Sequence, residues 1–249
     1  MDEDLDLLVR RVDEDRWLAS RFAPDDARGR LIAIYALNHE IARAAEAVRT
    51  PAIGDIRLAW WREALAEVHA GKRPRVHPVL HEYALARKSA DLPIGALEAL
   101  IDARSNDLEN APFATAAQRE AYIDATAGNV MRLAVAACGE NPQEHDALIR
   151  QAALAWGCSG LLRAEPAWRA RGRRVLAQAD ETLDALSDCS RAAYEALRAM
   201  AKAPPQVFPA LGYVTLVPTY LKALQRGRRD APLLIRQGKL VAAVATGRL

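Results

Sequence analysis

The segment from Arg28 to Arg49 constrains the fold most strongly, because its apolar residues recur with the period of an α-helix. At about 100° per residue, one face collects apolar side chains: Ile34, Leu37, Ile41, Ala45 and Val48. The other face mixes aromatic, amide, small and charged residues: Leu31, Tyr35, Asn38, Ala42, Glu46 and Arg49. The first face is typical of a helix packed on a core. The second is typical of a helix that lines a cavity.

The remaining sequence also favours an all-α fold. Aromatic residues make up 6% of the 249 residues, and Val, Ile and Thr form no alternating runs of the kind that mark strands. We expect one domain over residues 1–249, because a helical array of this size can bury one continuous core. Periodicity and helix-breaking residues predict further helices: Asp4–Phe22, Ile53–Ala70, Ile94–Leu108, Glu120–Cys138, Ala177–Ala203, Phe208–Leu224 and Leu234–Val244. Pro78 is typical of a first helical position, and Gly71 and Gly139 are typical of helix ends.

Charge and cysteine content exclude several classes of function. The chain has 34 Lys and Arg against 32 Asp and Glu, a formal charge of +2, so composition gives no indication of a nucleic-acid partner. The three cysteines are odd in number and widely spaced, which favours reduced thiols in a reducing compartment.

The N-terminal sequence predicts a cytoplasmic protein. It is acidic, with no basic region followed by an apolar segment of the kind found in signal peptides, and no Arg- and Ser-rich presequence. The chain also lacks an uninterrupted apolar run of the ~20 residues that a membrane-spanning helix needs. We therefore expect any contact with the inner membrane to be peripheral.

Two motifs carry a resemblance to the squalene/phytoene synthase family. Tyr35-Ala-Leu-Asn-His-Glu-Ile-Ala-Arg-Ala-Ala-Glu46 is similar to the family's Tyr-Ala-Phe-Cys-Arg-Glu-Val-Asp-Asp-x-x-Asp helix, with Ala42 and Glu46 in place of the two metal-binding aspartates. Ala155–Leu176 resembles the family's second acidic helix together with the Gly-Arg loop that follows it, and here Gly160, Ala164 and Trp168 replace Asn, Asp and a further acid. The resemblance implies an isoprenoid-synthase-type helical bundle around a central cavity.

Further matches extend the resemblance from about Asp15 to the end of the chain. Trp60-Trp61-Arg62-Glu63 and His77-Pro78-Val79-Leu80 match the family almost letter for letter. The resemblance also implies a set of cavity-lining residues: Tyr35, Asn38, Asp107, Tyr122, Gly128 and Arg163. We expect Arg163 to pair with Glu46 or Asp107, so that a salt bridge replaces a metal bridge.

The missing acids bear directly on function. In the family, Mg²⁺ held by these carboxylates neutralises the diphosphate that leaves during prenyl condensation, and only Glu46 of the four motif acids remains here. We therefore expect no catalytic residues and no metal or cofactor. Magnesium would be needed only if the chain were an active prenyltransferase with rearranged ligands.

One branch of the family shares the missing acids. The chain resembles the complex I assembly factor of squalene/phytoene synthase type and its bacterial relatives, most sharply in Leu162-Arg163-Ala164. That resemblance implies a pseudoenzyme whose partners are subunits or assembly intermediates of the respiratory NADH dehydrogenase, with a possible peripheral membrane contact. Two alternatives stay open: an active prenyl-diphosphate transferase, and a carrier that binds a lipid or isoprenoid without reacting it.

Overall fold

The computed structural model describes residues 4–46, 50–109, 111–170, 172, 175–176, 182–200 and 202–249. The fold is all-α, as predicted, and the only β pairing among these residues is an isolated bridge between Phe113 and Leu176. The helices are α1 (Leu5–Val12), α2 (Glu14–Ser20), α3 (Asp25–Glu46), α4 (Pro51–His69), α5 (Pro78–Arg87), α6 (Ile94–Ser105), α7 (Ala116–Ile123), α8 (Asn129–Ala137), α9 (Asp146–Ala170), α10 (Leu183–Ala199), α11 (Phe208–Leu211), α12 (Val217–Gln225) and α13 (Leu233–Thr246).

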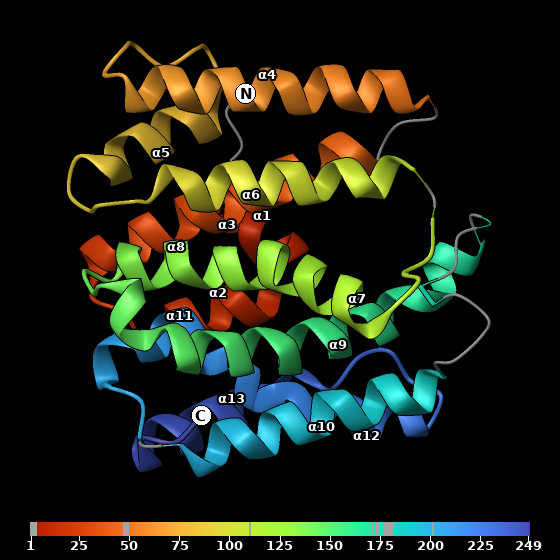
Figure 1. Cartoon of the computed structure of the whole chain (residues 1–249). Helices are drawn as coiled ribbons and strands as arrows, with labels where there is room; N and C mark the ends of the chain where they lie inside the picture. Colours follow the sequence, from red (N-terminus) through yellow and green to blue (C-terminus); the bar gives the residue numbers. More distant parts are fainter. Residues whose placement is uncertain are drawn as a thin grey trace.

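The long helices are arranged in layers (Figure 1). In that view α4 and α5 form the top, α6 and α3 follow, and α8, α9 and α10 succeed one another below. Helix α8 contacts both α3 and α9, and α9 packs along α10. The buried side chains of these layers form one hydrophobic cluster, which holds together helices from both ends of the chain.

Proline and glycine set several helix boundaries where the sequence predicts them. Helix α5 begins at Pro78, a position that lacks an intrahelical partner for its nitrogen in any case. Gly71 and Gly139 follow α4 and α8 with φ of +76° and +87°, a backbone region that costs glycine little.

Three predicted helices are interrupted. The first breaks at Asp13, whose φ of −147° and ψ of 61° separate α1 from α2. Glu120–Cys138 contains a π-helical turn, Asp124–Gly128, between α7 and α8. Phe208–Leu224 is wrong as a single helix, because the 3-10 helix Gly212–Leu216 separates α11 from α12, each of which has a proline in its first turn.

Adjacent residues of a helix point about 100° apart, and the two tryptophans of α4 differ in burial accordingly. Trp61 is buried and Trp60 is half-buried, their rings meet edge to face at 5.0 Å, and both rings lie against His77 at the start of α5. The pair therefore fixes α4 against the loop that leads into α5.

Within the described residues, one stretch is long and apolar enough to cross a membrane. It is Pro205–Gln225, with a mean hydropathy of 1.3, and 78% of its apolar window is buried inside the protein. Its burial assigns it to the core, around which α9, α2 and α13 pack.

Candidate functional site

Helix α3 places the first motif in the core. Tyr35 is wholly buried, Asn38 and Ala42 are half-buried, and Glu46 ends the helix with its side chain outside the described part of the structure. The hydroxyl of Tyr35 has no hydrogen-bond partner among the described residues. Burial raises the pKa of Tyr35 well above its ordinary value, so the phenol stays protonated at neutral pH.

A buried arginine that the sequence analysis missed lies beside Tyr35. The guanidinium of Arg16 in α2 is 5.8 Å from the Tyr35 ring and 5.0 Å from the ring of Tyr213, and it donates to Asp13 at 2.6 Å. Burial alone would lower the pKa of Arg16, but the carboxylate of Asp13 raises it, so this residue is a fixed interior cation. In the sequence, the only indication of this ion pair is that Asp13 and Arg16 are three residues apart, a separation at which side chains of a helix can meet.

Helix α9 carries the second motif, and there is open space next to Gly160 of this motif. A Cβ built at Gly160 would meet no atom within 4 Å. Ala164 is half-buried, and Trp168 packs against the core. Mg²⁺ takes oxygen ligands, and the side chains of Ala42, Gly160, Ala164 and Trp168 contain none. These four positions do not fit the metal that the family resemblance implies.

The described residues contain no group of three or more His, Cys, Asp or Glu side chains arranged to hold a metal ion. The side chain of Glu46 lies outside this statement, because the structure does not describe it.

Arg163 of α9 has different partners from those expected. Its guanidinium lies 3.9 Å from the Tyr220 ring centroid, 3.9 Å from a carboxylate oxygen of Asp15 and 3.6 Å from one of Asp230. The predicted pairing with Asp107 is wrong, because α2 and the α12–α13 loop bring two other carboxylates to Arg163. The alternative pairing with Glu46 lies outside the described side chains.

The Asp15 carboxylate is the centre of a network that joins the two ends of the chain. It is buried, accepts from the Tyr220 hydroxyl at 2.5 Å and is paired with Arg236 of α13 at 2.8 Å. Arg236 also pairs with Glu14. The partners of Asp15 lie more than 140 residues away in sequence, so no local pattern could have identified them.

Two of the predicted cavity residues do meet. The Tyr122 hydroxyl donates to the buried Asp107 carboxylate at 3.0 Å, and Arg104 pairs with the same carboxylate at 3.1 Å. This cluster joins the end of α6 to α7. Gly128 lies in the π-helical turn nearby in sequence, where an added Cβ would come within 2.7 Å of the Asp124 carboxylate.

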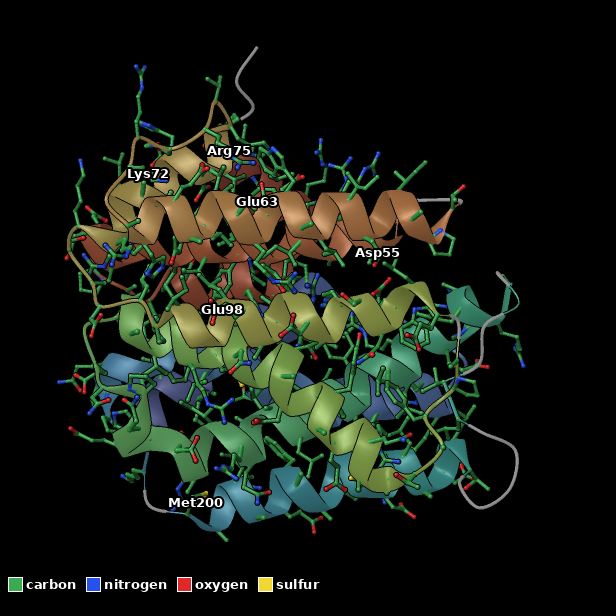
Figure 2. The ribbon with its side chains drawn as sticks, turned by 45° about the horizontal axis from the view of Figure 1, so that its top comes forward. Asp55, Glu63, Lys72, Arg75, Glu98 and Met200 are labelled. Carbon is green, nitrogen blue, oxygen red and sulfur yellow. The ribbon has the colours of Figure 1, made fainter. Side chains whose placement is uncertain are left out.

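Two clefts lie elsewhere, on the α3–α5 side of the molecule. One, of about 1500 Å³, is bordered by α1, α3, α5 and the α4–α5 loop, and the other, of about 420 Å³, lies between α3 and α4. Figure 2 shows Lys72 and Arg75 on that loop, and Arg75 is paired with Glu63 at 3.1 Å. None of the predicted cavity residues lines either cleft, so cavity lining by those residues remains a prediction.

Five of the thirteen exposed large apolar side chains among the described residues lie on α13. Leu234 is 80% exposed and Val241 58%, and three more large apolar residues of this helix are also exposed: Leu233, Ile235 and Val244. Helix α13 contains no acidic residue. A helix face of this kind is typical of a surface that binds another molecule.

Comparison with solved structures shows the same fold in two synthases. A dehydrosqualene synthase solved with a ligand superposes with a TM-score of 0.83 at 13% identity, covering 97% of this chain and 94% of that one. A squalene synthase from Alicyclobacillus acidocaldarius gives 0.65 at 18% identity, covering 98% and 92%.

Comparison with curated proteins finds assembly factors. The protein named NADH dehydrogenase (ubiquinone) complex I, assembly factor 6 is 26% identical in Mus musculus, over 64% of this chain and 47% of that protein. Its Rattus norvegicus counterpart is 24% identical over 88% and 72%. The match to the mouse protein thus spans about half of its length.

The comparison with protein families decides membership. The squalene/phytoene synthase model matches residues 9–180, which include both motif helices and most of the layers around them. This chain belongs to the squalene/phytoene synthase family.

Proposed function

We propose that this protein is a non-catalytic accessory factor for the assembly of respiratory complex I, acting at the periphery of the inner membrane. The observation that carries the proposal is the loss of side-chain oxygen on both motif helices, at Ala42 of α3 and at Gly160, Ala164 and Trp168 of α9. Losing one preorganised charge-stabilising contact typically costs ~10²–10³ in rate. Three of the four motif acids are missing here, at Ala42, Ala164 and Trp168.

The state of Arg163 supports the same conclusion. Its guanidinium lies within 4 Å of carboxylate oxygens of Asp15 and Asp230 and over the Tyr220 ring. These two carboxylates offset part of its charge within the protein, so less of it is left for an anionic ligand. A site of this kind stabilises the bundle and no longer stabilises a leaving group.

The names of the curated relatives indicate the cellular process, the assembly of respiratory complex I. They are complex I assembly factors, and the match to the rat protein extends over 88% of this chain. We infer that the partners are subunits or assembly intermediates of the respiratory NADH dehydrogenase. The exposed apolar face of α13 offers a surface for such a contact.

A diphosphate-release assay tests the negative half of the proposal. The purified chain is incubated with farnesyl or geranylgeranyl diphosphate and Mg²⁺, beside an active squalene synthase as positive control. We expect no release above the protein-free blank. Mg²⁺-dependent release would reverse the assignment in favour of a prenyltransferase, and an isoprenoid retained in native mass spectrometry would favour a carrier.

Genetic complementation tests the positive half. Deleting the gene should reduce the amount of assembled NADH dehydrogenase on native gels. A Glu46→Gln copy should restore assembly as well as the unchanged gene, because the proposed role does not use the last motif acid. Failure of the Glu46→Gln copy, with its protein at normal abundance, would indicate that carboxylate chemistry persists.

A further inference from the structure

Cys158 and Cys189 lie side by side where α9 packs along α10, and Figure 1 shows α10 below α9 in the lower half of the molecule. Their sulfur atoms are 3.6 Å apart, and the Cys158 thiol donates to the sulfur of Cys189. Cys158 is wholly buried, whereas Cys189 is partly exposed. A disulfide needs a sulfur separation of ~2.05 Å, so the two sulfurs must approach by about 1.5 Å.

The surroundings make the two thiols chemically different. The guanidinium of Arg119, from α7, lies 4.0 Å from the sulfur of Cys189. The hydrogen bond from Cys158 and, to a smaller extent, the charge of Arg119 lower the pKa of Cys189 to about 7. Burial and Glu120 act in the opposite direction. The same hydrogen bond and burial raise the pKa of Cys158. Cys189 is also the partly exposed thiol of the two and the one beside a cation, so it is the nucleophile of the pair.

The third cysteine is a natural comparison. Burial raises the pKa of Cys138 to about 12, because it lies at the end of α8 with most of its thiol enclosed. A protonated thiol is a poor nucleophile. Cys138 is therefore an internal control for the rate of thiol oxidation, because it has no neighbouring thiol and its pKa is not lowered.

We propose that Cys189 is a hydroperoxide-reactive site and that Cys158 is its resolving cysteine, the two closing to a disulfide between α10 and α9. This proposal does not depend on the role in complex I assembly. The Cys189 thiolate attacks one oxygen of hydrogen peroxide, the O–O bond breaks, and hydroxide leaves to give a sulfenic acid. The Cys158 sulfur then attacks the sulfenic sulfur, and the departing hydroxide takes the thiol proton.

The overall step is balanced. Two thiols lose two electrons and two protons, and one peroxide becomes two waters. A dithiol reductant reverses the step by thiol–disulfide exchange. The bond would fix α10 to the helix that carries Gly160, Ala164 and Trp168.

The test uses the full-length protein with hydrogen peroxide as the probe. Free thiols are alkylated under native conditions at set times, and the peptides are mapped by mass spectrometry without reduction. We expect a Cys158–Cys189 linked peptide that dithiothreitol removes, with Cys189 consumed at least ~10-fold faster than Cys138. The rate should rise with pH through about 7, following the thiolate of Cys189.

Conservative variants separate the two roles. Cys158→Ser should keep the fast step and stop at a sulfenic acid that dimedone traps on Cys189. Cys189→Ser should abolish the fast step, and Cys138→Ser should behave like the unchanged protein. Oxidation of Cys138 as fast as Cys189, or disulfides only between molecules, would overturn the proposal.

Discussion

Gly157 and Gly160 of α9 offer a test of how tightly this helix is packed. A Cβ added at Gly157 would come within 2.9 Å of Cγ1 of Ile123 and closer still to its Cγ2, whereas one added at Gly160 would meet nothing within 4 Å. Both residues are inside the same helix. The substitutions Gly157→Ala and Gly160→Ala therefore change intrinsic helix propensity equally and differ in their contacts.

The expected magnitudes follow from these distances. Replacing a helix-interior glycine by alanine stabilises by roughly 0.5–1 kcal/mol. We expect that full gain for Gly160→Ala. The methyl group of Gly157→Ala would press on Ile123, a buried, β-branched residue that cannot easily move. Such overpacking costs about 1–3 kcal/mol, so the free energies of unfolding of the two variants should differ by about that amount.

Urea unfolding followed by circular dichroism measures the difference. With a denaturant slope of ~2–3 kcal/mol per molar, the midpoint of Gly160→Ala should lie about 0.3–1.5 M above that of Gly157→Ala. In an Ile123→Ala background, the loss caused by Gly157→Ala should be smaller, because the space left by the removed isoleucine atoms accepts the new methyl group. Equal midpoints for the two glycine variants would refute the inferred close contact between α9 and Ile123.

Two further predictions concern buried charge. Arg236→Met should lower the free energy of unfolding by about 3 kcal/mol, because it leaves the Asp15 carboxylate, 6% exposed, without its nearest cation. The matched change Arg191→Met, at an exposed pair, should stay within ~0.5 kcal/mol; similar losses in both would contradict the inferred network. Burial and the Arg87 charge lower the pKa of His69, whose Nδ1 accepts a hydrogen bond from Arg87 Nε at 3.0 Å. The contribution of His69 to the free energy of unfolding should therefore be full above the unfolded-state pKa of ~6.5 and be lost as pH falls through the folded-state pKa. Nuclear magnetic resonance should show His69 neutral at pH 6.5, and His69→Gln should weaken the loss of stability between pH 7 and 5; a His69 that titrates at or above 6.5 would contradict this.

The helical character of the chain was readable from local chemistry. The apolar repeat of Arg28–Arg49 predicts α3, Pro78 predicts the start of α5, and Gly71 and Gly139 predict helix ends, because each depends on the backbone preferences of a few adjacent residues. The family resemblance added the fold and located the altered motif positions. It did so because those motifs occupy single helices, where spacing in sequence is spacing in space.

The breaks inside predicted helices were decided by tertiary packing. The turn at Asp13 lets α2 bring Arg16 beside Tyr35 and Tyr213, and Gly212 is held against the Phe208 ring where the predicted helix is interrupted. Local propensity does not include these contacts. A helical period in sequence therefore overestimated helix continuity in this part of the chain.

The partners of the buried charges and thiols were decided only by the assembled bundle. Arg163 meets Asp15 from the other end of the chain, and Cys189 meets Cys158 across two helices. The sequence by itself determined where helices form and which motif acids are missing, because both are local properties. The tertiary structure alone determined which charges neutralise one another and which thiol is reactive, because electrostatic energy and burial depend on distance in space.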